Sequence, residues 1–285
     1  MTIQNNLSAV SAMNKLMINA NQTRNNMQQL ASGSRINRAG NDPAGLAVAM
    51  KMQTQIGGTD MAVRNANDGI GLIQTAEGAL SETHTMLSRL KMLSVQSSSG
   101  LLSSDQRSFI QMEADQIMSE INRISQATDF NGIRPLNGSL AGDGGMVLQI
   151  GDRNGEPQQA TVNINNMSSA AIGLAGFNIS TQNGALNALG LTDNAVNTVS
   201  EQRASLGAMQ NRLEHTVNSL INTSENLTAA KSRIADADMA SSVIENTKNN
   251  ILRQASLAML AHAVEQPKGL STLWDSAAPP RSFRV

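Results

Sequence analysis

The chain has 285 residues, a formal net charge of −1 and no cysteine, with only 2% aromatic and 15% charged residues. The lack of cysteine excludes disulfides, thiolate metal sites and thiol nucleophiles, and the near-neutral charge indicates no nucleic-acid-binding surface. No apolar run is long enough to predict a membrane span, and no Sec-type signal peptide is expected at the N-terminus. Because large aromatic side chains are scarce, we expect no cofactor pocket.

The N-terminal segment shows a thin helical pattern of apolar residues separated by polar ones. Its stripe consists of Ile3, Leu7, Val10 and Met17, with Leu30 following later. A turn is expected near residues 40–43, where Asp42 can cap a second helix that has Pro43 at its first position. The pair Gly57-Gly58 weakens this helix without necessarily ending it.

A stronger pattern covers residues 59–96, where apolar positions alternate steps of four and three residues. This heptad-like seam comprises Leu72, Ala76, Ala79, Thr83, Met86, Leu90 and Leu93. The run Ser97-Ser98-Ser99-Gly100 predicts a break, after which Asp105 can cap a further helix that ends near Thr128. Residues 129–192 carry glycine-rich turns around two short alternating runs, 146–150 and 160–164, which predict one hairpin. We expect residues 166–190 to form an irregular connection.

The most regular pattern lies in residues 193–234, with an apolar residue at every seventh position. The seam consists of Val199, Leu206, Leu213, Leu220, Leu227 and Ile234, and Val217 and Ile221 broaden it. Such a helix would be about 60 Å long, which exceeds the diameter of about 50 Å of a compact globule of this length. A last helix is expected from 239 to 264, ended by Pro267 and Gly269.

The two halves of the chain therefore mirror one another, and folding back on itself would bury both seams. The predicted fold is mainly α, an elongated antiparallel helical coiled-coil rod with one small β-hairpin. We expect terminal helices in 1–40 plus 235–285, a helical rod in 41–140 plus 191–234, and the hairpin with a short connection in 141–190. The terminal stripes bury so little apolar area that we expect them to order only on assembly.

Three stretches of sequence resemble one known family. They are LASGSRINRAGNDPAGLAVAMKM (30–52), NDGIGLIQTAEGALSE (67–82) and IADADMASSVIENTKNNILRQASLAMLAHA (234–263). Together they identify the chain as similar to bacterial flagellin, the subunit of the flagellar filament, over about 1–140 and 190–269. With so short a segment between the two regions, it resembles a minimal flagellin that lacks the outer variable domains.

The resemblance implies a structural, non-enzymatic protein that is exported unfolded by the flagellar type III apparatus and polymerises into the extracellular filament for motility. The terminal helices would pair as a coiled coil in the filament core. The implied partners are further copies of the chain, an export chaperone bound to the C-terminal helix, and the filament cap and hook-associated proteins. Nucleic acid and membranes are not among them.

The resemblance also implies recognition by the host Toll-like receptor 5, with a contact formed by Arg89, Leu93 and Glu113. The last residues, 270–285, depart from the family pattern. Here Pro279-Pro280 disfavours a helix, and Trp274 and Phe283 are unusual for a narrow filament lumen.

Two alternatives remain open at this stage. The first is a hook–filament junction protein, which shares flagellin-like ends but caps instead of growing long polymers. The second is an enzyme or binding module in residues 129–192, although no clustered ligand or catalytic set is evident there. His84, His215 and His262 lack ligand spacing, Asp236 and Asp238 indicate helix caps, and Gly69-Ile-Gly71 indicates tight helix packing and not a nucleotide loop.

Overall fold

The structure, a computed structural model, describes residues 6–277, and it describes side chains as far as residue 266 except that of Asp143. The elements in chain order are α1 (Leu7–Ser32), α2 (Pro43–Ser98), α3 (Ser104–Ala127), η1 (Gly142–Gly144), β1 (Met146–Gln149), η2 (Glu156–Gln158), β2 (Gln159–Val162), α4 (Gln182–Ala235) and α5 (Met239–Ala277). The prediction of a mainly helical fold with one small hairpin is confirmed. The chain divides into two compact units, Met1–Gln53 with Thr228–Val285 and Thr54–Leu227, so the hairpin belongs to the second unit.

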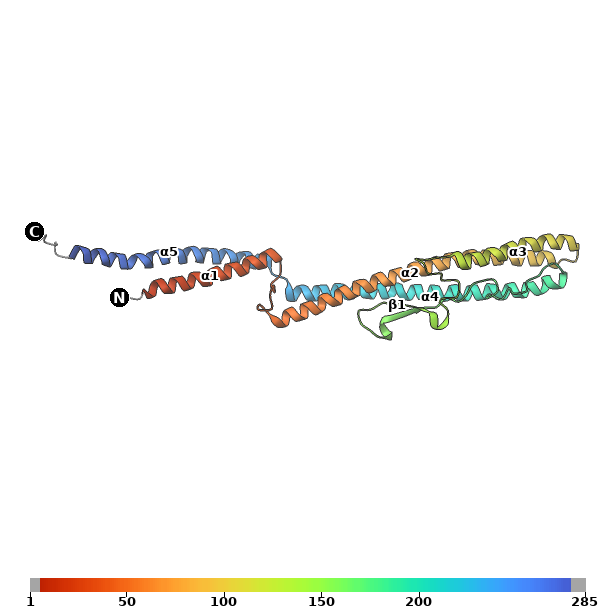
Figure 1. Ribbon diagram of the computed structural model, residues 1–285, viewed down its shortest axis with the longest axis horizontal. Helices are drawn as coiled ribbons and strands as arrows, with labels where there is room; N and C mark the ends of the chain where they lie inside the picture. The colour runs from red at the N-terminus through yellow and green to blue at the C-terminus, as the bar shows by residue number, and fades with distance from the viewer. Residues whose placement is uncertain (1–5, 278–285) are drawn as a thin grey trace, which may run out of the picture. The chain divides into compact units, whose positions relative to one another are not determined.

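Within residues 54–227, α2 and α4 run side by side in antiparallel directions (Figure 1). Polar contacts fix their register, because later residues of α2 meet earlier residues of α4. The Lys91 Nζ lies 2.5 Å from Asp193 Oδ1, and the Arg203 guanidinium lies 3.7 Å from the Glu77 carboxylate. The folding back predicted from the two seams is therefore present in this unit.

The core of this unit is built from the predicted heptad positions. Leu72, Leu90 and Leu93 of α2 are buried, as are Val199, Leu206 and Leu213 of α4. Helix α3 adds further buried side chains to the same cluster, among them Ala114 and Ile121. The predicted heptad positions therefore form the contact surface between packed helices.

The segment after α3 is more ordered than the sequence predicted. Residues 166–181 have no regular secondary structure, yet Ile172, Leu174, Phe177 and Ile179 are buried in the core. The Ser97 hydroxyl donates to the Ile179 carbonyl at 2.5 Å, and the Ile179 amide donates to Gln111 at 2.6 Å. An irregular backbone can be buried here because side chains of two helices satisfy its polar groups.

The predicted hairpin is confirmed, with β1 and β2 paired antiparallel from Met146↔Val162 to Gln149↔Gln159. It docks on α2 at Gly69, where a Cβ atom would lie 2.3 Å from Leu148 Cδ1. The Asn65 side chain donates to the Gln149 carbonyl at 3.0 Å beside this contact. Glycine at 69 thus permits close packing, as its placement inside a helical pattern indicated.

Helix α4 begins at Gln182, eleven residues before the predicted start at Asp193. The glycines and asparagines of this stretch lower helix propensity, but burial of Ala185 and Ala188 in the core outweighs that preference. Asp193 is consequently an interior helix residue that pairs with Lys91.

Two other helix ends also differ from expectation. The N-cap of α3 is Ser103, whose capping box with Gln106 was missed, while Asp105 lies in the first turn. Helix α5 continues through Pro267 and Gly269 to Ala277. The prediction that these two residues end the helix was wrong, and nothing in the structure explains why the helix tolerates the proline. Ile3, Pro279, Pro280 and Phe283 and the side chain of Trp274 lie outside the described residues.

In the unit formed by the two ends of the chain, α1 and α5 run side by side (Figure 1). The links before α2 and before α5 are joined to each other by an isolated bridge between Ser34 and Asp236. The backbone amide of Arg35 donates to the Ala235 carbonyl at 2.7 Å, and its guanidinium donates to the Ile234 carbonyl at 2.5 Å. These bonds hold the two links together.

Helix caps complete this unit, and those at Asp42 and Asp238 were predicted. Gly33 ends α1 in the left-handed conformation, with φ of 69°. The Asp42 carboxylate accepts from the Gly45 amide at 2.9 Å at the start of α2. Asp238 accepts from the amides of Ala240 and Ser241 at the start of α5, whereas Asp236 lies in the bridge.

Candidate functional site

The terminal pair of helices has an unusual distribution of residues between its inner and outer faces. Residues at alternating steps of three and four along α1 are buried or half-buried: Ala9, Ala12, Leu16, Asn19, Thr23, Asn26 and Leu30. Their counterparts along α5 are Ser242, Asn246, Asn249, Ser256, Leu260 and Ala263. The surface between the two helices is therefore made mostly of small and polar side chains.

Direct contacts show that these two faces meet. The Asn6 side chain donates to the Ala263 carbonyl at 2.6 Å, and Asn19 donates to Ser256 Oγ at 3.1 Å. Nearer the other end of the pair, the Asn246 amide approaches Met27 Sδ at 3.9 Å. The helices pair antiparallel in one defined register.

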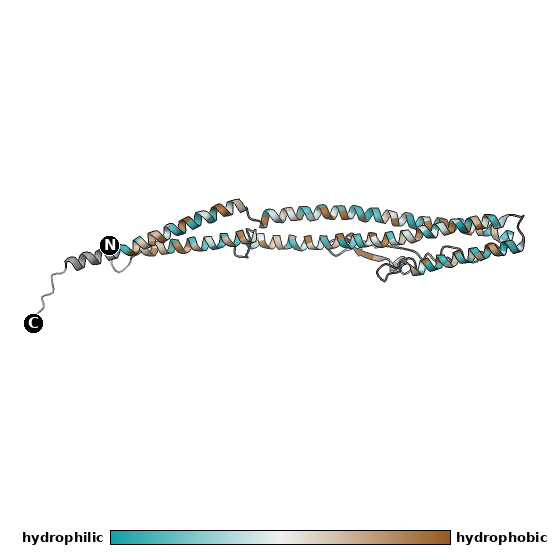
Figure 2. Ribbon diagram, turned by 90° about the horizontal axis from the view of Figure 1, so that it is seen from above, coloured by the Kyte–Doolittle hydropathy of each residue, from teal (hydrophilic) through white to brown (hydrophobic). Residues whose placement is uncertain are grey.

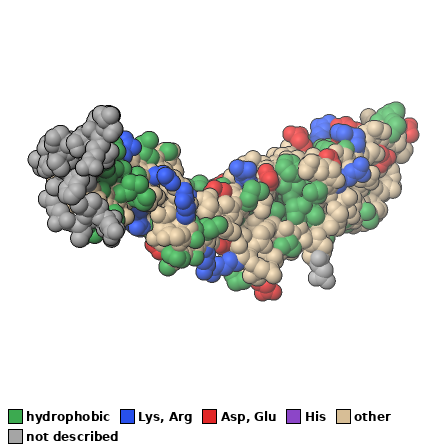
Figure 3. Space-filling view, turned by 60° about the vertical axis from the view of Figure 1, so that its left-hand side comes forward, with side chains coloured by type: hydrophobic (Ala, Val, Ile, Leu, Met, Phe, Trp, Pro, Cys, Tyr) green, Lys and Arg blue, Asp and Glu red, His purple; other side chains and the backbone are tan. Residues whose placement is uncertain are grey.

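Large apolar side chains of the same pair are exposed instead. Leu7 is 78% exposed, Ile244 is 69% exposed and Met259 is 65% exposed. The other exposed members of this outer apolar face are Val10, Met13, Met17, Ile18, Met239, Val243, Ile251, Leu252, Leu257 and Val264. Figure 3 shows patches of hydrophobic side chains at several places along one face of the molecule. The pair thus buries mostly small and polar side chains and leaves many of its large apolar side chains exposed, the reverse of an ordinary two-helix coiled coil.

The apolar stripe predicted for the first helix does exist, but it lies on the outside. Leu7, Val10 and Met17 face away from α5 and are exposed, whereas Leu30 lies on the inner face. Apolar periodicity could not reveal the inner face, because its members are mostly small or polar. The available signal was the 3-4 spacing of Ala, Thr and Asn in residues 9–26. Figure 2 shows hydrophobic and hydrophilic residues interspersed along the helices.

Burial of the seven-residue seam of α4 decreases toward the C-terminal end of the helix. Val199, Leu206 and Leu213 are buried, whereas Leu220, Leu227 and Ile234 are only half-buried and Ile221 is exposed. In α2, Leu72 and Leu90 are buried and Met86 is partly buried against the core. The later part of the α4 seam thus keeps apolar surface available to another partner.

The surface predicted for a receptor lies where α2 and α3 meet. The Arg89 guanidinium donates to Glu113 Oε1 at 2.6 Å and 2.8 Å, and both side chains are about half exposed. Leu93 is 1% exposed and packs in the core, so its side chain is not part of this exposed surface. The structure therefore brings together two of the three predicted residues at the surface.

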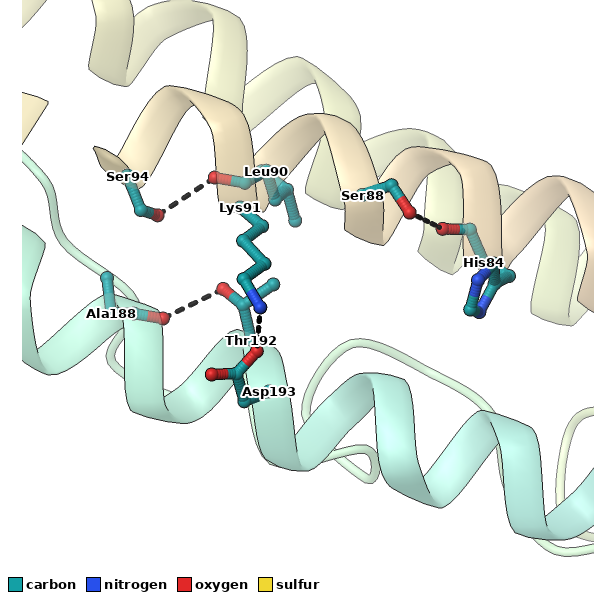
Figure 4. Close-up of polar contacts among 8 residues, drawn as sticks. All are labelled: His84, Ser88, Leu90, Lys91, Ser94, Ala188, Thr192 and Asp193. Carbon is teal, nitrogen blue, oxygen red and sulfur yellow. Dashed lines mark hydrogen bonds and ion pairs between the residues drawn. The ribbon is translucent and has the colours of Figure 1, made fainter. Parts of the chain in front are cut away.

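On another side of α2, Lys91 forms an ion pair with Asp193 of α4 (Figure 4). A shallow hollow beside it is lined by Ser88, Lys91, Met92, Val95 and Val196. Met92 and Val95 are both more than half exposed there. The hollow has few polar groups, so it offers packing surface and no arrangement for chemistry.

One charged pair lies on the exposed surface of α3. The hydrogen bond donated by Arg123 lowers the pKa of the Glu120 carboxyl, and the nearby positive charge of Arg123 adds to this effect. In turn, Glu120 raises the pKa of Arg123. Such a pair between residues i and i+3 supports the helix modestly.

The described residues contain no group of three or more His, Asp or Glu side chains that could hold a metal ion. His84, His215 and His262 lie on three different helices, α2, α4 and α5. No helix in the described part of the chain is long and apolar enough to cross a membrane.

Comparisons with known proteins agree with this architecture. Residues 3–141 match the bacterial flagellin N-terminal helical region, and residues 189–273 match the bacterial flagellin C-terminal helical region. A flagellin from Halalkalibacterium halodurans is 45% identical over 273 residues, covering 96% of this chain and 99% of its own. A flagellar filament 30.7 kDa core protein from Treponema maltophilum is 40% identical, with the same coverage.

A solved structure supports the fold independently. It is described as a flagellar hook-associated protein from Vibrio parahaemolyticus and superposes with a TM-score of 0.58. It covers 69% of this chain and all of that one, at 12% sequence identity. Since the family models span both helical regions and the relatives align over nearly the whole sequence, the chain belongs to the bacterial flagellin family.

Proposed function

We propose that the protein is a structural subunit that polymerises into the extracellular filament of the bacterial flagellum and serves motility. The observation that carries this function is the terminal pair, whose helices meet through mostly small and polar side chains and leave many large apolar side chains exposed. A large exposed apolar surface marks an interaction site. The occupant we propose is the same surface of further copies of the chain.

Burial of the outer face between copies of the chain should contribute more free energy than burial of the inner face within one terminal pair. Full burial of an exposed Leu, Ile or Met contributes about 1.5–3 kcal/mol, and many such side chains line the outer face. The inner face contributes less, because its small and polar residues bury little apolar area. Contacts among many subunits can therefore exceed the free-energy cost of association, and they order the terminal helices at the same time.

Relatives with matching names support the same function, since one is a flagellin and another a flagellar filament core protein. We extend the proposal to export in an unfolded state by the flagellar type III apparatus, which suits a chain without cysteine. Before assembly, the exposed Ile251, Leu252 and Leu257 of α5 would bind an export chaperone. The filament cap and hook-associated proteins complete the proposed partners, and we propose no catalytic activity.

The decisive experiment is electron microscopy of the purified chain after seeding with short filaments or adding a precipitating salt, which strengthens apolar association. We expect long regular filaments from the full chain and none from a folded fragment of residues 41–234. Filaments from this fragment would refute the role of the terminal helices. Short caps without growth would favour the hook–filament junction alternative.

A point variant tests the outer face directly. Ile251→Asp places a charge on the outer apolar face and should abolish filaments without changing the thermal unfolding of residues 54–227. The matched control is Val147→Asp, which replaces an aliphatic residue that is 55% exposed on the hairpin. Loss of filaments in both variants, or in neither, would contradict assembly through the terminal pair.

We further propose that the paired Arg89 and Glu113 form the surface contact for Toll-like receptor 5. Their partial exposure and close pairing support this role, and the sequence resemblance supplies the receptor. Charge reversal of both residues should weaken binding to the receptor ectodomain more than tenfold, measured by surface plasmon resonance on the monomer. Equal binding by the wild type and this variant would refute it.

A further inference from the structure

Asparagine is followed directly by glycine at four places in the chain, Asn131, Asn137, Asn154 and Asn183. This dipeptide is prone to deamidation, because glycine has no Cβ to hinder the approach of its backbone nitrogen to the preceding side chain. All four asparagines are exposed, so water reaches each of them. Dipeptide sequence and exposure therefore do not distinguish the four sites, and the comparison depends on their local hydrogen bonds.

Deamidation requires the peptide group between the two residues to turn. The glycine amide nitrogen attacks Cγ of the asparagine and forms an N–Cγ bond, while the Cγ–Nδ2 bond breaks and the side-chain nitrogen leaves as ammonia, taking up the amide proton. Water then opens the cyclic imide and leaves an aspartyl or isoaspartyl residue, whose carboxylate adds one negative charge. Because the peptide group is rigid, a hydrogen bond to its N–H or C=O opposes this rotation.

At two of the four sites the attacking nitrogen is already a hydrogen-bond donor. The Gly132 amide, which follows Asn131, donates to Asp129 Oδ1 at 3.0 Å. The Gly184 amide donates to Thr181 Oγ1 at 3.1 Å, and it lies in the first turn of α4. Ring closure at either site has to break this bond and distort the local backbone.

Asn137 is restrained through its own side chain. Its Oδ1 accepts from the Ser139 amide at 2.9 Å, which forms a local side-chain turn. The next residue, Gly138, packs closely against the chain, because a Cβ atom there would lie 3.0 Å from Asn166 Cβ. Rotation at this site would break the turn and move a packed segment.

Asn154 lies in the loop between β1 and β2, where the hydrogen bonds stop on either side of it. The Gln149 side chain donates to the Arg153 carbonyl at 2.7 Å, and the Gln158 amide donates to the Gly155 carbonyl at 2.9 Å. Neither bond involves the peptide group between Asn154 and Gly155. Within the described part of the chain, that peptide group and the Asn154 side chain have no hydrogen-bond partner.

We infer that Asn154 is a modification site, the asparagine at which the folded chain deamidates fastest. The reaction needs only water, and it does not depend on assembly into filaments. It adds a negative charge to a loop that already carries Asp152 and Glu156 around Arg153. Because the Asn154 side chain makes no hydrogen bond, Asn154→Asp should unfold at the same temperature as the wild type.

The test is incubation of the soluble full chain in mildly alkaline heavy-oxygen water, followed by peptide mapping with mass spectrometry. The same chain in denaturant gives the rate that each dipeptide has without the fold. We expect Asn154 to react at similar rates in both states, and the other three to react at least about tenfold more slowly when folded, equivalent to about 1.4 kcal/mol. Tenfold slowing at Asn154 as well, or faster reaction at another site in the folded chain, would overturn the inference.

A variant pair tests the role of the hydrogen bonds. Asp129→Ala removes the acceptor of the Gly132 amide and should speed deamidation at Asn131 in the folded chain, with Asn137 and Asn183 unchanged. The matched control Asp129→Asn keeps an acceptor oxygen and should leave the rate at Asn131 low. Faster reaction at all restrained sites would reveal unfolding of the variant, which thermal unfolding followed by circular dichroism also detects. An unchanged rate at Asn131 in folded Asp129→Ala would overturn the reasoning on which the assignment of Asn154 rests.

Discussion

Replacing a leucine by alanine in the buried half of the α4 seam should lower the free energy of unfolding more than the same replacement in the half-buried part. Leu213 is completely buried and lies next to Gly69, where a Cβ atom would be 3.5 Å from Leu213 Cδ1. Replacing it by alanine should cost about 3–4 kcal/mol, from lost burial and the cavity left behind. Leu220 belongs to the same seven-residue period but is half-buried, so Leu220→Ala should cost on the order of 1 kcal/mol.

Thermal unfolding of the full chain, followed by circular dichroism at 222 nm, separates the two cases. For a unit of this size, 1 kcal/mol corresponds to about 2–4 °C in Tm. The cooperative transition should fall by about 6–16 °C for Leu213→Ala and by about 2–4 °C for Leu220→Ala. Filament formation should be impaired by Leu220→Ala beyond its effect on Tm. Equal shifts, or a larger shift for Leu220→Ala, would refute the argument from burial.

Two further outcomes follow from the second unit. Gly69→Val should displace the hairpin and lower its protection from proteolysis, because the added side chain occupies the space now filled by Leu148; an unchanged digestion pattern would contradict the packing. In Arg123→Met, the pKa of Glu120 should rise toward its ordinary value in an NMR titration. Because that pKa is lowered in the folded chain, the stabilisation by this pair is present above the ordinary Glu pKa and is lost as the pH falls through the lowered value.

Apolar periodicity alone determined the main elements of this protein. The seven-residue repeat from Val199 to Leu213 and the alternating steps from Leu72 to Leu93 identified helices that must pack together. Turn chemistry located Asp42 and the hairpin correctly, since capping and glycine preferences are local properties of the chain. Helix propensity misplaced the start of α4, because the burial of Ala185 and Ala188 depends on residues far away in the sequence.

The tertiary structure alone decided which side of each stripe is covered. The sequence placed Leu7, Val10 and Met17 on one face, but a periodic pattern carries no information about what that face meets. In the folded chain α1 presents small and polar residues to α5 and leaves its apolar residues outside. The sequence thus determined that these helices have two distinct faces. Pairing in three dimensions decided that the polar face is internal and that the apolar face is free for other subunits, because burial is a property of the whole fold.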